Sequence, residues 1–392
     1  MILKSGRDKP VRNGHPWVFS GAVAKVDGSV EPGEIVHVCS ADGTSLATAY
    51  YNPRSRIAAR VFGLGEFPVD AGYLGKRLAS AWELRKRTLD FSGTDAFRIV
   101  NAEGDFLPGL FIDKYADCLV TQFNTAGMER LRGAIIAALV EIFSPRAIID
   151  RSEGALRHEE GLAPSTGALI GSQSEPIDVT IAGVRQRVSL RDGHKTGLYL
   201  DQASNLRSLD QYLRTAKLNA GARALNLFAY HGGFSIVAAH HGLTTTSVDT
   251  SAPALAQARE NFTLNGLDPA EHSFIDKDCF AFLRSDTEKY SLIILDPPPF
   301  ARKAGQENAA ARGYKELHLR ALSLLERDGT LFTWSCSQRI SRDFFQKIIF
   351  EAAVDAGRNV RVIDSFGAGS DHPFSIFHPE GEYLKGFALS VE

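Results

Sequence analysis

The spacing of apolar residues predicts a first domain of short strands. Alternating apolar positions recur over residues 15–23, 33–40, 45–51 and 56–62, with Gly, Pro, Asp and Asn between them. Short strands at this spacing are typical of a small all-β domain. We therefore expect a small β-barrel over residues 1–70.

The next part of the chain mixes the two periodicities. Apolar residues recur every three or four positions over 70–90 and again over 128–143, which predicts two amphipathic helices. Residues 106–123 are typical of a hairpin that turns at residues 113–117. Further strands are expected at 146–152 and within 176–190. We interpret residues 71–190 as a small α+β middle domain.

Beyond about residue 191, strand-like runs alternate regularly with helical runs. The strand-like runs are ALNLFAY, TTTSVDT, HSFIDKD, SLIILDPPP, GTLFTWSCS and NVRVIDSF, each followed by a helical pattern except the last. Alternation of this kind predicts a parallel sheet with helices on both faces. Ligands of such α/β folds bind at the carboxyl ends of the strands. Residues 191–392 are thus predicted to form one α/β domain, with its site just past these strands.

Three of these strand ends suggest a nucleoside site. Paired Gly232 and Gly233 allow a tight turn close to a ligand, although a plain strand-to-helix turn has the same pattern, and the GxGxxG fingerprint is absent. Asp249 could accept both hydroxyls of a ribose, or it could act with Thr250 and Ser251 as a helix cap. Asp278 could accept from an adenine amino group.

Together these features predict an adenosine site without a phosphate cradle. S-adenosylmethionine fits such a site better than a dinucleotide does, because no pyrophosphate needs to be held.

The fourth strand ends in the sequence Asp-Pro-Pro-Pro-Phe, residues 296–300. Asp296 follows a largely apolar run, and three prolines then hold the backbone extended. Such a rigid loop can present carbonyl groups and a carboxylate to a flat ring. A purely structural role for the prolines is the alternative.

Cys336 lies between two serines at the end of the fifth strand, where a nucleophile is expected. Carbon 5 of cytosine is a weak nucleophile, and a thiolate added to carbon 6 would make it reactive toward a methyl sulfonium. Asp296 could stabilise the altered ring. For Cys39, Cys118 and Cys279 we favour the interpretation of buried packing residues.

Charge and cysteine content narrow the class of protein. The 392 residues carry a formal net charge of −2, which does not suggest a surface coated in basic charge. A local basic patch is enough for RNA, and Arg7, Lys9 and Arg12 form a candidate patch, with a solvated turn as the alternative.

The four cysteines form no CxxC pair, so neither a disulfide framework nor a metal site is predicted. The chain lacks a signal-peptide core and any apolar run near ~20 residues, so we expect a cytoplasmic protein that does not insert in a membrane.

Over essentially its whole length the chain resembles the RlmI-type 23S ribosomal RNA 5-cytosine methyltransferases. Its motifs occur in the order of that family and are GRDKPVRNGHPWVFSGAV, HKTGLYLDQ, NLFAYHGGF, VDTSAPALAQARENFTLNG, DPPPF, RGYKEL, SCS and DHPFSIFHPEGEYLKGF. Several of these motifs are weak alone, but their joint order is hard to obtain by chance.

The resemblance implies a PUA domain, a middle α+β domain and a class I Rossmann-like methyltransferase domain that uses S-adenosylmethionine. It implies that Cys336 is the cysteine nucleophile and that Asp296 is the acid of the motif. It also implies a ribosomal RNA substrate and a homodimer. The implied cofactor contacts are Tyr199, Asp201, Gln202, Asn226, Phe228, Tyr230, Gly232, Gly233, Asp249 and Asp278, with Thr250, Ser251 and Asp296 beside them. We expect RNA contacts from Arg7, Lys9, Arg12, Pro297, Pro298 and Phe300.

Two positions depart from the family pattern. Pro299 stands where the family usually has Lys, and His318 stands where it tends to have Asn. The target within ribosomal RNA could therefore differ, while the nucleophile assignment is unaffected.

Other functions fit the sequence less well. Methylation of uracil carbon 5, or of a purine ring or exocyclic nitrogen, is the main alternative, although the nitrogen reactions need no cysteine. A nicotinamide-dependent dehydrogenase conflicts with the missing GxGxxG motif. A non-catalytic RNA-binding factor conflicts with the retention of both Asp296 and Cys336.

Overall fold

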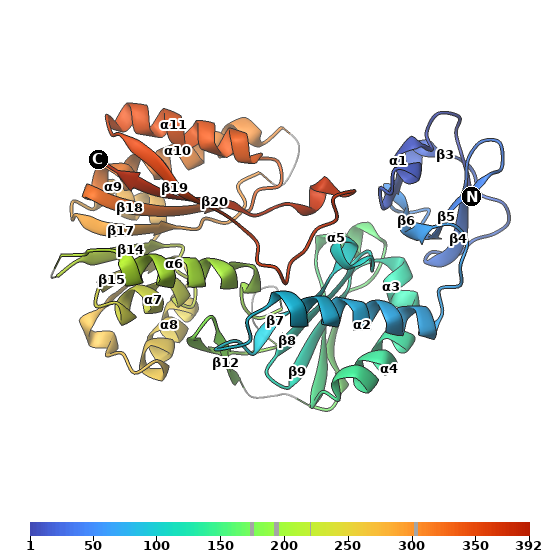
Figure 1. Cartoon of the computed structure of the whole chain (residues 1–392), viewed down its shortest axis with the longest axis horizontal. Helices are drawn as coiled ribbons and strands as arrows, with labels where there is room; N and C mark the ends of the chain where they lie inside the picture. Colours follow the sequence, from blue (N-terminus) through green and yellow to red (C-terminus); the bar gives the residue numbers. More distant parts are fainter. Residues whose placement is uncertain (173–175, 192–195, 220, 302–304) are drawn as a thin grey trace. The chain divides into compact units, whose positions relative to one another are not determined.

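The computed structural model describes residues 1–172, 176–191, 196–219, 221–301 and 305–392. The chain separates into two compact units that interleave along the sequence (Figure 1). The first unit comprises Met1–Val179, Val188–Leu200 and Ser370–Gly381, and the second comprises Thr180–Arg187, Asp201–Gly369 and Glu382–Glu392. The division into three domains at residues 70 and 190 stays a prediction.

The first unit begins with a six-stranded sheet, which agrees with the strand-rich start of the sequence. Its strands are β1 (Ile2–Leu3), β2 (Trp17–Phe19), β3 (Val23–Lys25), β4 (Glu34–Cys39), β5 (Ser45–Tyr51) and β6 (Ile57–Leu64), and the short helix α1 spans Lys9–Arg12. The strand order is β2-β6-β5-β4-β1-β3. Apolar side chains such as Leu3, Val38 and Ala49 form its core.

A second, five-stranded sheet of the same unit has the order β11-β10-β9-β8-β7. Its elements are β7 (Ala96–Asn101), β8 (Leu110–Tyr115), β9 (Cys118–Phe123), β10 (Ala147–Ser152), β11 (Ser165–Ile170), α2 (Ala71–Thr88), α3 (Ala126–Arg130), α4 (Arg132–Phe143) and α5 (Ala155–Glu159). The predicted helix over 70–90 is confirmed as α2. Asp70 caps it by accepting from the Tyr73 amide at 2.8 Å.

The predicted hairpin is confirmed, but its turn is shorter than expected. We expected the turn at residues 113–117, whereas β8 continues through Asp113 to Tyr115 and only Ala116 and Asp117 connect the strands. Asp113 is fully buried inside the strand and accepts from Arg98 Nε at 2.7 Å. That ion pair lets a carboxylate remain in the sheet interior, which the polarity of the residue alone did not indicate.

The second unit contains a seven-stranded sheet of order β16-β15-β14-β17-β18-β20-β19. Its strands are β14 (Arg223–Leu227), β15 (Thr244–Asp249), β16 (Ser273–Asp276), β17 (Tyr290–Leu295), β18 (Leu325–Ser335), β19 (Val360–Gly367) and β20 (Lys385–Val391). The predicted strands are present, but the sheet is mixed, because β20 runs antiparallel to both β18 and β19. The strand order reverses between β14 and β17, which is where ligands bind in open α/β sheets.

Helices cover both faces of this sheet, as the alternation predicted (Figure 1). They are α6 (Ala203–Thr215), α7 (Gly233–His240), α8 (Ala252–Leu264), α9 (Cys279–Ser285), α10 (Glu307–Leu324) and α11 (Arg342–Ala356). Leu283, Leu317 and Phe345 of α9, α10 and α11 pack with the strand residues Leu225 and Leu295 in one core. Helix α6 was not among the predicted elements. A two-stranded sheet pairs β12 (Ile177–Ile181) with β13 (Val184–Val188).

A late segment of the chain, Ser370–Gly381, belongs to the first unit rather than the second. It is held there by Arg85, which is completely buried and donates to the Asp371 carbonyl at 2.7 Å. The same guanidinium binds both carboxylate oxygens of Asp105. One buried cation thus joins α2, the turn after β7 and residues 370–381.

Replacing Arg85 by Ala should destabilise the first unit. The substitution leaves the Asp105 carboxylate buried without its partner, and breaking a buried ion pair in this way costs about 3–5 kcal/mol. Unfolding can be followed by tryptophan fluorescence, since Trp17 and Trp82 lie in this unit. Exposed Arg87→Ala on the same helix is the control, and equal unfolding midpoints for the two variants would contradict the assignment.

Candidate functional site

Parallel pairing places the ends of β14, β15, β16, β17 and β18 at one edge of the second unit's sheet. Most of the predicted cofactor and catalytic residues follow these strands. Tyr199, Arg7, Lys9 and Arg12 belong instead to the first unit, and each is exposed. His194 and Lys195 of the HKTGLYLDQ motif lie outside the described residues.

The loop after β14 adopts an unusual backbone. Phe228, Tyr230 and Gly232 all have positive φ, at 60°, 47° and 78°. For the two aromatic residues a left-handed conformation costs of order 1–3 kcal/mol each and persists only where the surroundings enforce it. Strain of this kind is concentrated at ligand-binding turns, so this loop is a candidate binding element.

Asp249 enforces part of this loop. Its Oδ2 accepts from the Tyr230 amide and its Oδ1 accepts from the Ser251 amide, both at 2.9 Å. Ser251 is the N-cap of α8 and accepts from the Ala254 amide at 3.3 Å, while Thr250 is exposed. Each carboxylate oxygen has a second lone pair, so Asp249 retains the capacity to accept from a ligand hydroxyl.

Asp278 caps α9, where its Oδ1 accepts from the Ala281 amide at 2.9 Å, and its side chain is exposed. Asn226 is buried in β14 and donates to Ser235 Oγ at 2.9 Å, which joins the strand to α7. Gly233 begins α7. Asp278 is thus a helix cap, and Asp249 supports the cap residue Ser251, and neither bond excludes a ligand role.

Asp296 is oriented by a chain of amides. Gln202 Nε2 donates to Asp296 Oδ2 at 2.8 Å, and Asn205 Nδ2 donates to Gln202 Oε1 and to the Gly367 backbone carbonyl. Neighbouring Asp201 accepts from the Tyr383 hydroxyl at 2.6 Å. Gln202 thus contacts the acid that sequence analysis placed at the centre of the site, and Asn205 is a supporting residue that it missed.

Cys336 follows β18 and faces the proline loop. Its thiol donates to the Pro297 carbonyl at 3.7 Å, and the side chain is partly exposed. Cys118 and Cys279 are buried, and burial raises the pKa of their thiols to about 11 and about 12. Cys39 was expected to be buried, but it is partly exposed at the end of β4, where the strand meets a turn.

A buried hydroxyl cluster holds this cysteine in place. The Tyr314 hydroxyl lies 2.9 Å from Ser335 Oγ and 3.0 Å from Ser337 Oγ, and burial raises the Tyr314 pKa to about 12. Ser337 Oγ also accepts from the Phe300 amide at 3.1 Å. The two serines around Cys336 are therefore tied to the loop that carries Asp296.

The environment of Cys336 also contains a cation that sequence analysis missed. Lys385 is buried and donates to the Ser337 carbonyl at 2.6 Å and to the Tyr383 carbonyl at 3.0 Å. Burial lowers the Lys385 pKa to about 8, and the charge of Cys336 acts in the opposite direction. Tyr314 and Lys385 both lie within motifs of the resemblance, RGYKEL and EYLKGF, and this was the only signal for them.

The two residues that depart from the family pattern, His318 and Pro299, lie in different environments. His318 is completely buried, and burial lowers its pKa to about 4. Its ring nitrogens form hydrogen bonds with the Tyr314 carbonyl at 2.7 Å and with Thr333 Oγ1 at 2.9 Å. A neutral buried ring of this kind supports α10 and cannot touch a substrate directly. Pro299 is partly exposed in the loop, between exposed Pro298 and half-buried Phe300. Phe300 packs on the Tyr314 ring at 4.8 Å.

The arrangement suits covalent chemistry on a flat ring. A partly exposed thiol with a buried ammonium nearby is a candidate nucleophile, and the carboxylate of Asp296 can accept from a ring substituent. Among the described residues no cluster of three or more His, Cys, Asp or Glu side chains could hold a metal ion. No helix in the described part of the chain is long and apolar enough to cross a membrane.

Comparison with known proteins identifies both parts of the chain. Residues 1–63 match the PUA-like domain family, and residues 118–365 match the S-adenosylmethionine-dependent methyltransferase family. Ribosomal RNA large subunit methyltransferase I of Erwinia tasmaniensis is 41% identical over 397 residues, covering all of this chain and 99% of that protein.

Solved structures agree on the fold. A Streptococcus mutans protein assigned as a SAM-dependent methyltransferase has a TM-score of 0.83 and 23% identity, covering 100% of this chain and 99% of that one. A protein assigned as a methyltransferase and crystallised with SAH has a TM-score of 0.84 and 24% identity at the same coverage. The expected fold, a PUA-like domain with a Rossmann-like methyltransferase domain, is confirmed.

Replacing Lys385 by Met should make the Cys336 thiolate harder to form. Loss of a neighbouring positive charge raises a thiol pKa, so the pH midpoint of Cys336 alkylation should rise by about one unit or more. Because the Lys385 pKa is about 8, its ammonium is present below that pH. The alkylation rates of the wild type and of Lys385→Met should therefore differ most below pH 8. Iodoacetamide labelling of the Cys336 peptide, read by mass spectrometry across pH, measures this midpoint.

Exposed Lys347→Met on α11 is the matched control for a lost positive charge. Identical alkylation profiles for Lys385→Met and Lys347→Met would show that Lys385 does not act on the thiol.

Proposed function

The chain belongs to the S-adenosylmethionine-dependent methyltransferase family, and from this premise we propose that it methylates carbon 5 of a cytosine in large-subunit ribosomal RNA. The cofactor is S-adenosylmethionine. The full-length relatives named ribosomal RNA large subunit methyltransferase I support the RNA substrate. The observation that carries the choice of atom is Cys336, a partly exposed thiol at the end of β18 within 3.7 Å of the Pro297 carbonyl.

The second unit offers groups that suit the cofactor. Asp249 and Asp278 would bind the ribose hydroxyls and the adenine amino group with the acceptor capacity that their capping bonds leave. The turn from Phe228 through Tyr230 to Gly233 would pack against the adenosine, with Asn226, Asp201 and Gln202 behind it. Thr250, Ser251 and exposed Tyr199 complete the proposed set. When bound, the cofactor supplies a methyl group on a sulfonium, which is a strong electrophile.

The chemistry at the base is assigned to this chain's own residues. The Cys336 thiolate adds to carbon 6 of cytosine, which makes carbon 5 nucleophilic enough to accept the methyl group. Asp296, held by Gln202, contacts the polar edge of the ring and stabilises its altered charge. Loss of the proton from carbon 5 and of the thiolate from carbon 6 then restores the aromatic ring and the free cysteine.

Further parts of the proposal concern the surroundings of the reaction. Pro297, Pro298 and Phe300 would line the path of the target base, and Arg7, Lys9 and Arg12 of the PUA-like domain would contact RNA phosphates. A cytoplasmic location follows from a ribosomal substrate, and we retain the homodimer as part of the proposal.

The decisive test supplies labelled S-adenosylmethionine and unmodified large-subunit RNA to the wild type and to Cys336→Ala, followed by digestion to nucleosides. Wild type should place the label in 5-methylcytosine, and Cys336→Ala should reduce it by on the order of 1,000-fold or more, because the nucleophile is lost. Cys39→Ala, a partly exposed cysteine outside the site, should retain full activity.

Label in another nucleoside, or equal label with Cys336→Ala, would contradict the cysteine mechanism and favour uracil or a purine nitrogen as acceptor. The same experiment on assembled large subunits covers the case in which naked RNA is not recognised. Absence of label on both substrates would contradict the proposed function.

A further inference from the structure

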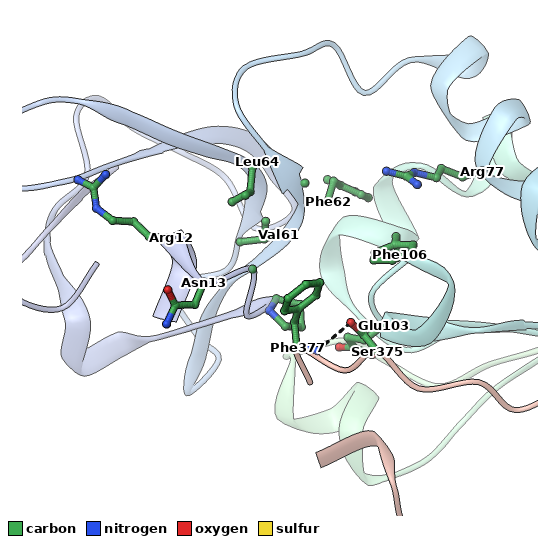
Figure 2. Close-up of a pocket in the computed structure, with 13 residues that line it drawn as sticks. Arg12, Asn13, Val61, Phe62, Leu64, Arg77, Glu103, Phe106, Ser375 and Phe377 are labelled. Atoms are coloured by element: carbon green, nitrogen blue, oxygen red, sulfur yellow. Dashed lines mark hydrogen bonds between the residues drawn. The ribbon is translucent and has the colours of Figure 1, made fainter. Parts of the chain in front are cut away.

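A second candidate binding site lies within the first unit, apart from the residues assigned to the methyl-transfer reaction. It is a cavity of about 700 Å³, within the range of small-ligand pockets. The residues that line it come from the end of α1 and the turn after it, from β6, from α2, from the turn after β7 and from residues 370–381 (Figure 2). Of the residues predicted from sequence to contact RNA, Arg12 lies here.

Exposed apolar side chains dominate this cavity. Leu64, Phe106 and Phe377 are 55%, 46% and 54% exposed, although large apolar side chains are usually buried. Contiguous exposed apolar surface on a protein usually marks a binding site. The two phenylalanines come from distant parts of the chain and both border the cavity in Figure 2.

Local structure constrains both phenylalanines. Phe106 ends a short helical turn in the left-handed conformation, with φ of 58°, which is uncommon for a residue other than glycine. Phe377 packs over Gly14, where a Cβ atom would lie only 3.2 Å from the ring. Two solvent-exposed rings that line one cavity suit the binding of a flat ligand, because an aromatic side chain has few rotatable bonds and loses little entropy when the ligand stacks.

The cavity also carries positive charge. Arg77 lies over the Phe106 ring at 5.1 Å and over the Tyr73 ring at 5.3 Å, and among the described residues no carboxylate pairs with it. Arg12 pairs with Asp8 at 2.6 Å but keeps 46% of its side chain exposed. The combination of exposed aromatic rings and guanidinium groups is the one that proteins use for bases and phosphates of unpaired nucleotides.

One acid lines the cavity, but its charge is already compensated. Glu103 Oε1 accepts from Trp17 Nε1 at 2.7 Å and from the buried guanidinium of Arg60 at 2.9 Å. Because Arg60 compensates its charge, Glu103 should repel an anionic ligand only weakly. This compensation leaves Arg12 and Arg77 as the charges that an incoming ligand meets.

We propose that this cavity binds an unpaired nucleotide of the RNA substrate, distinct from the nucleotide that is methylated. Phe106 and Phe377 stack on the base, and Arg77 and Arg12 contact its phosphates. The inference rests on the proposed function only in that the ligand is RNA. Its consequence is a second point of recognition, which would favour RNA that carries an unpaired base in addition to the target.

The test measures equilibrium binding of a fluorescein-labelled single-stranded RNA oligonucleotide by fluorescence anisotropy. Phe106→Leu keeps an apolar side chain at this left-handed backbone position and removes the aromatic face. It should weaken binding by about 5- to 150-fold, the range measured for loss of one stacked base. Phe19→Leu is the control, because Phe19 is equally exposed in the same unit but does not line the cavity.

Salt dependence separates stacking from charge. Arg77→Gln should weaken binding and reduce the slope of log K against log salt by about 0.7, because one phosphate contact on a single strand is lost. Phe106→Leu should leave this slope unchanged. Lys76→Gln, an exposed neighbour on α2 outside the cavity, should change neither affinity nor slope beyond the general loss of one distant charge.

The outcomes distinguish this inference from the proposed function. If the wild type produces 5-methylcytosine while Phe106→Leu and Arg77→Gln bind RNA as tightly as their controls, the cavity assignment is wrong and the reaction stands. If no 5-methylcytosine forms but both variants weaken RNA binding, the cavity assignment is supported and the proposed reaction is contradicted. Variants that alter the oligomeric mass in light scattering but not RNA affinity would identify the cavity as a contact between copies of the chain.

Discussion

The candidate site depends on one buried hydroxyl, Ser337 Oγ. It accepts from the Phe300 and Ala301 amides and bonds the Tyr314 hydroxyl, which in turn accepts from Ser335. The loop that follows β17 and the turn that follows β18 are thereby fixed to each other and to α10. Because Asp296 lies on that loop and Cys336 lies in that turn, these bonds connect the backbone segments that carry the acid and the thiol.

Several residues at this edge carry structural and chemical roles together. Asp249 fixes the strained turn after β14 through Tyr230 and also faces the place where a ribose is expected. Asp278 caps a helix with one oxygen and keeps further acceptor capacity. The scaffold thus orients its acids before any ligand arrives, which reduces the entropy that binding must overcome.

The chain passes from the second unit back to the first and then returns to the second, and this path contributes residues to both candidate sites. Residues 370–381 return to the first unit, where Arg85 and Asn101 bind their backbone carbonyls and where Phe377 completes the cavity wall. The segment that continues from Glu382 supplies Tyr383 and Lys385 to the second unit. One stretch of sequence, DHPFSIFHPEGEYLKGF, therefore contributes to the candidate RNA-binding cavity and to the surroundings of Cys336.

By itself the sequence determined the alternation of strands and helices, the strand ends that carry Asp249, Asp278, Asp296 and Cys336, and the likeness to a methyltransferase family. Local periodicity and turn chemistry encode the strands, the helices and the strand ends, since these depend on neighbours within a few residues. The likeness rests instead on motifs that occur in the family's order along the whole chain. Only the tertiary structure decided that Asp113 stays inside a strand, that β20 runs antiparallel, and that His318 is buried. It alone brought Lys385 and Tyr314 to Cys336, and Phe106 to Phe377, because contacts between residues far apart in the chain depend on packing and pairing that no local pattern records.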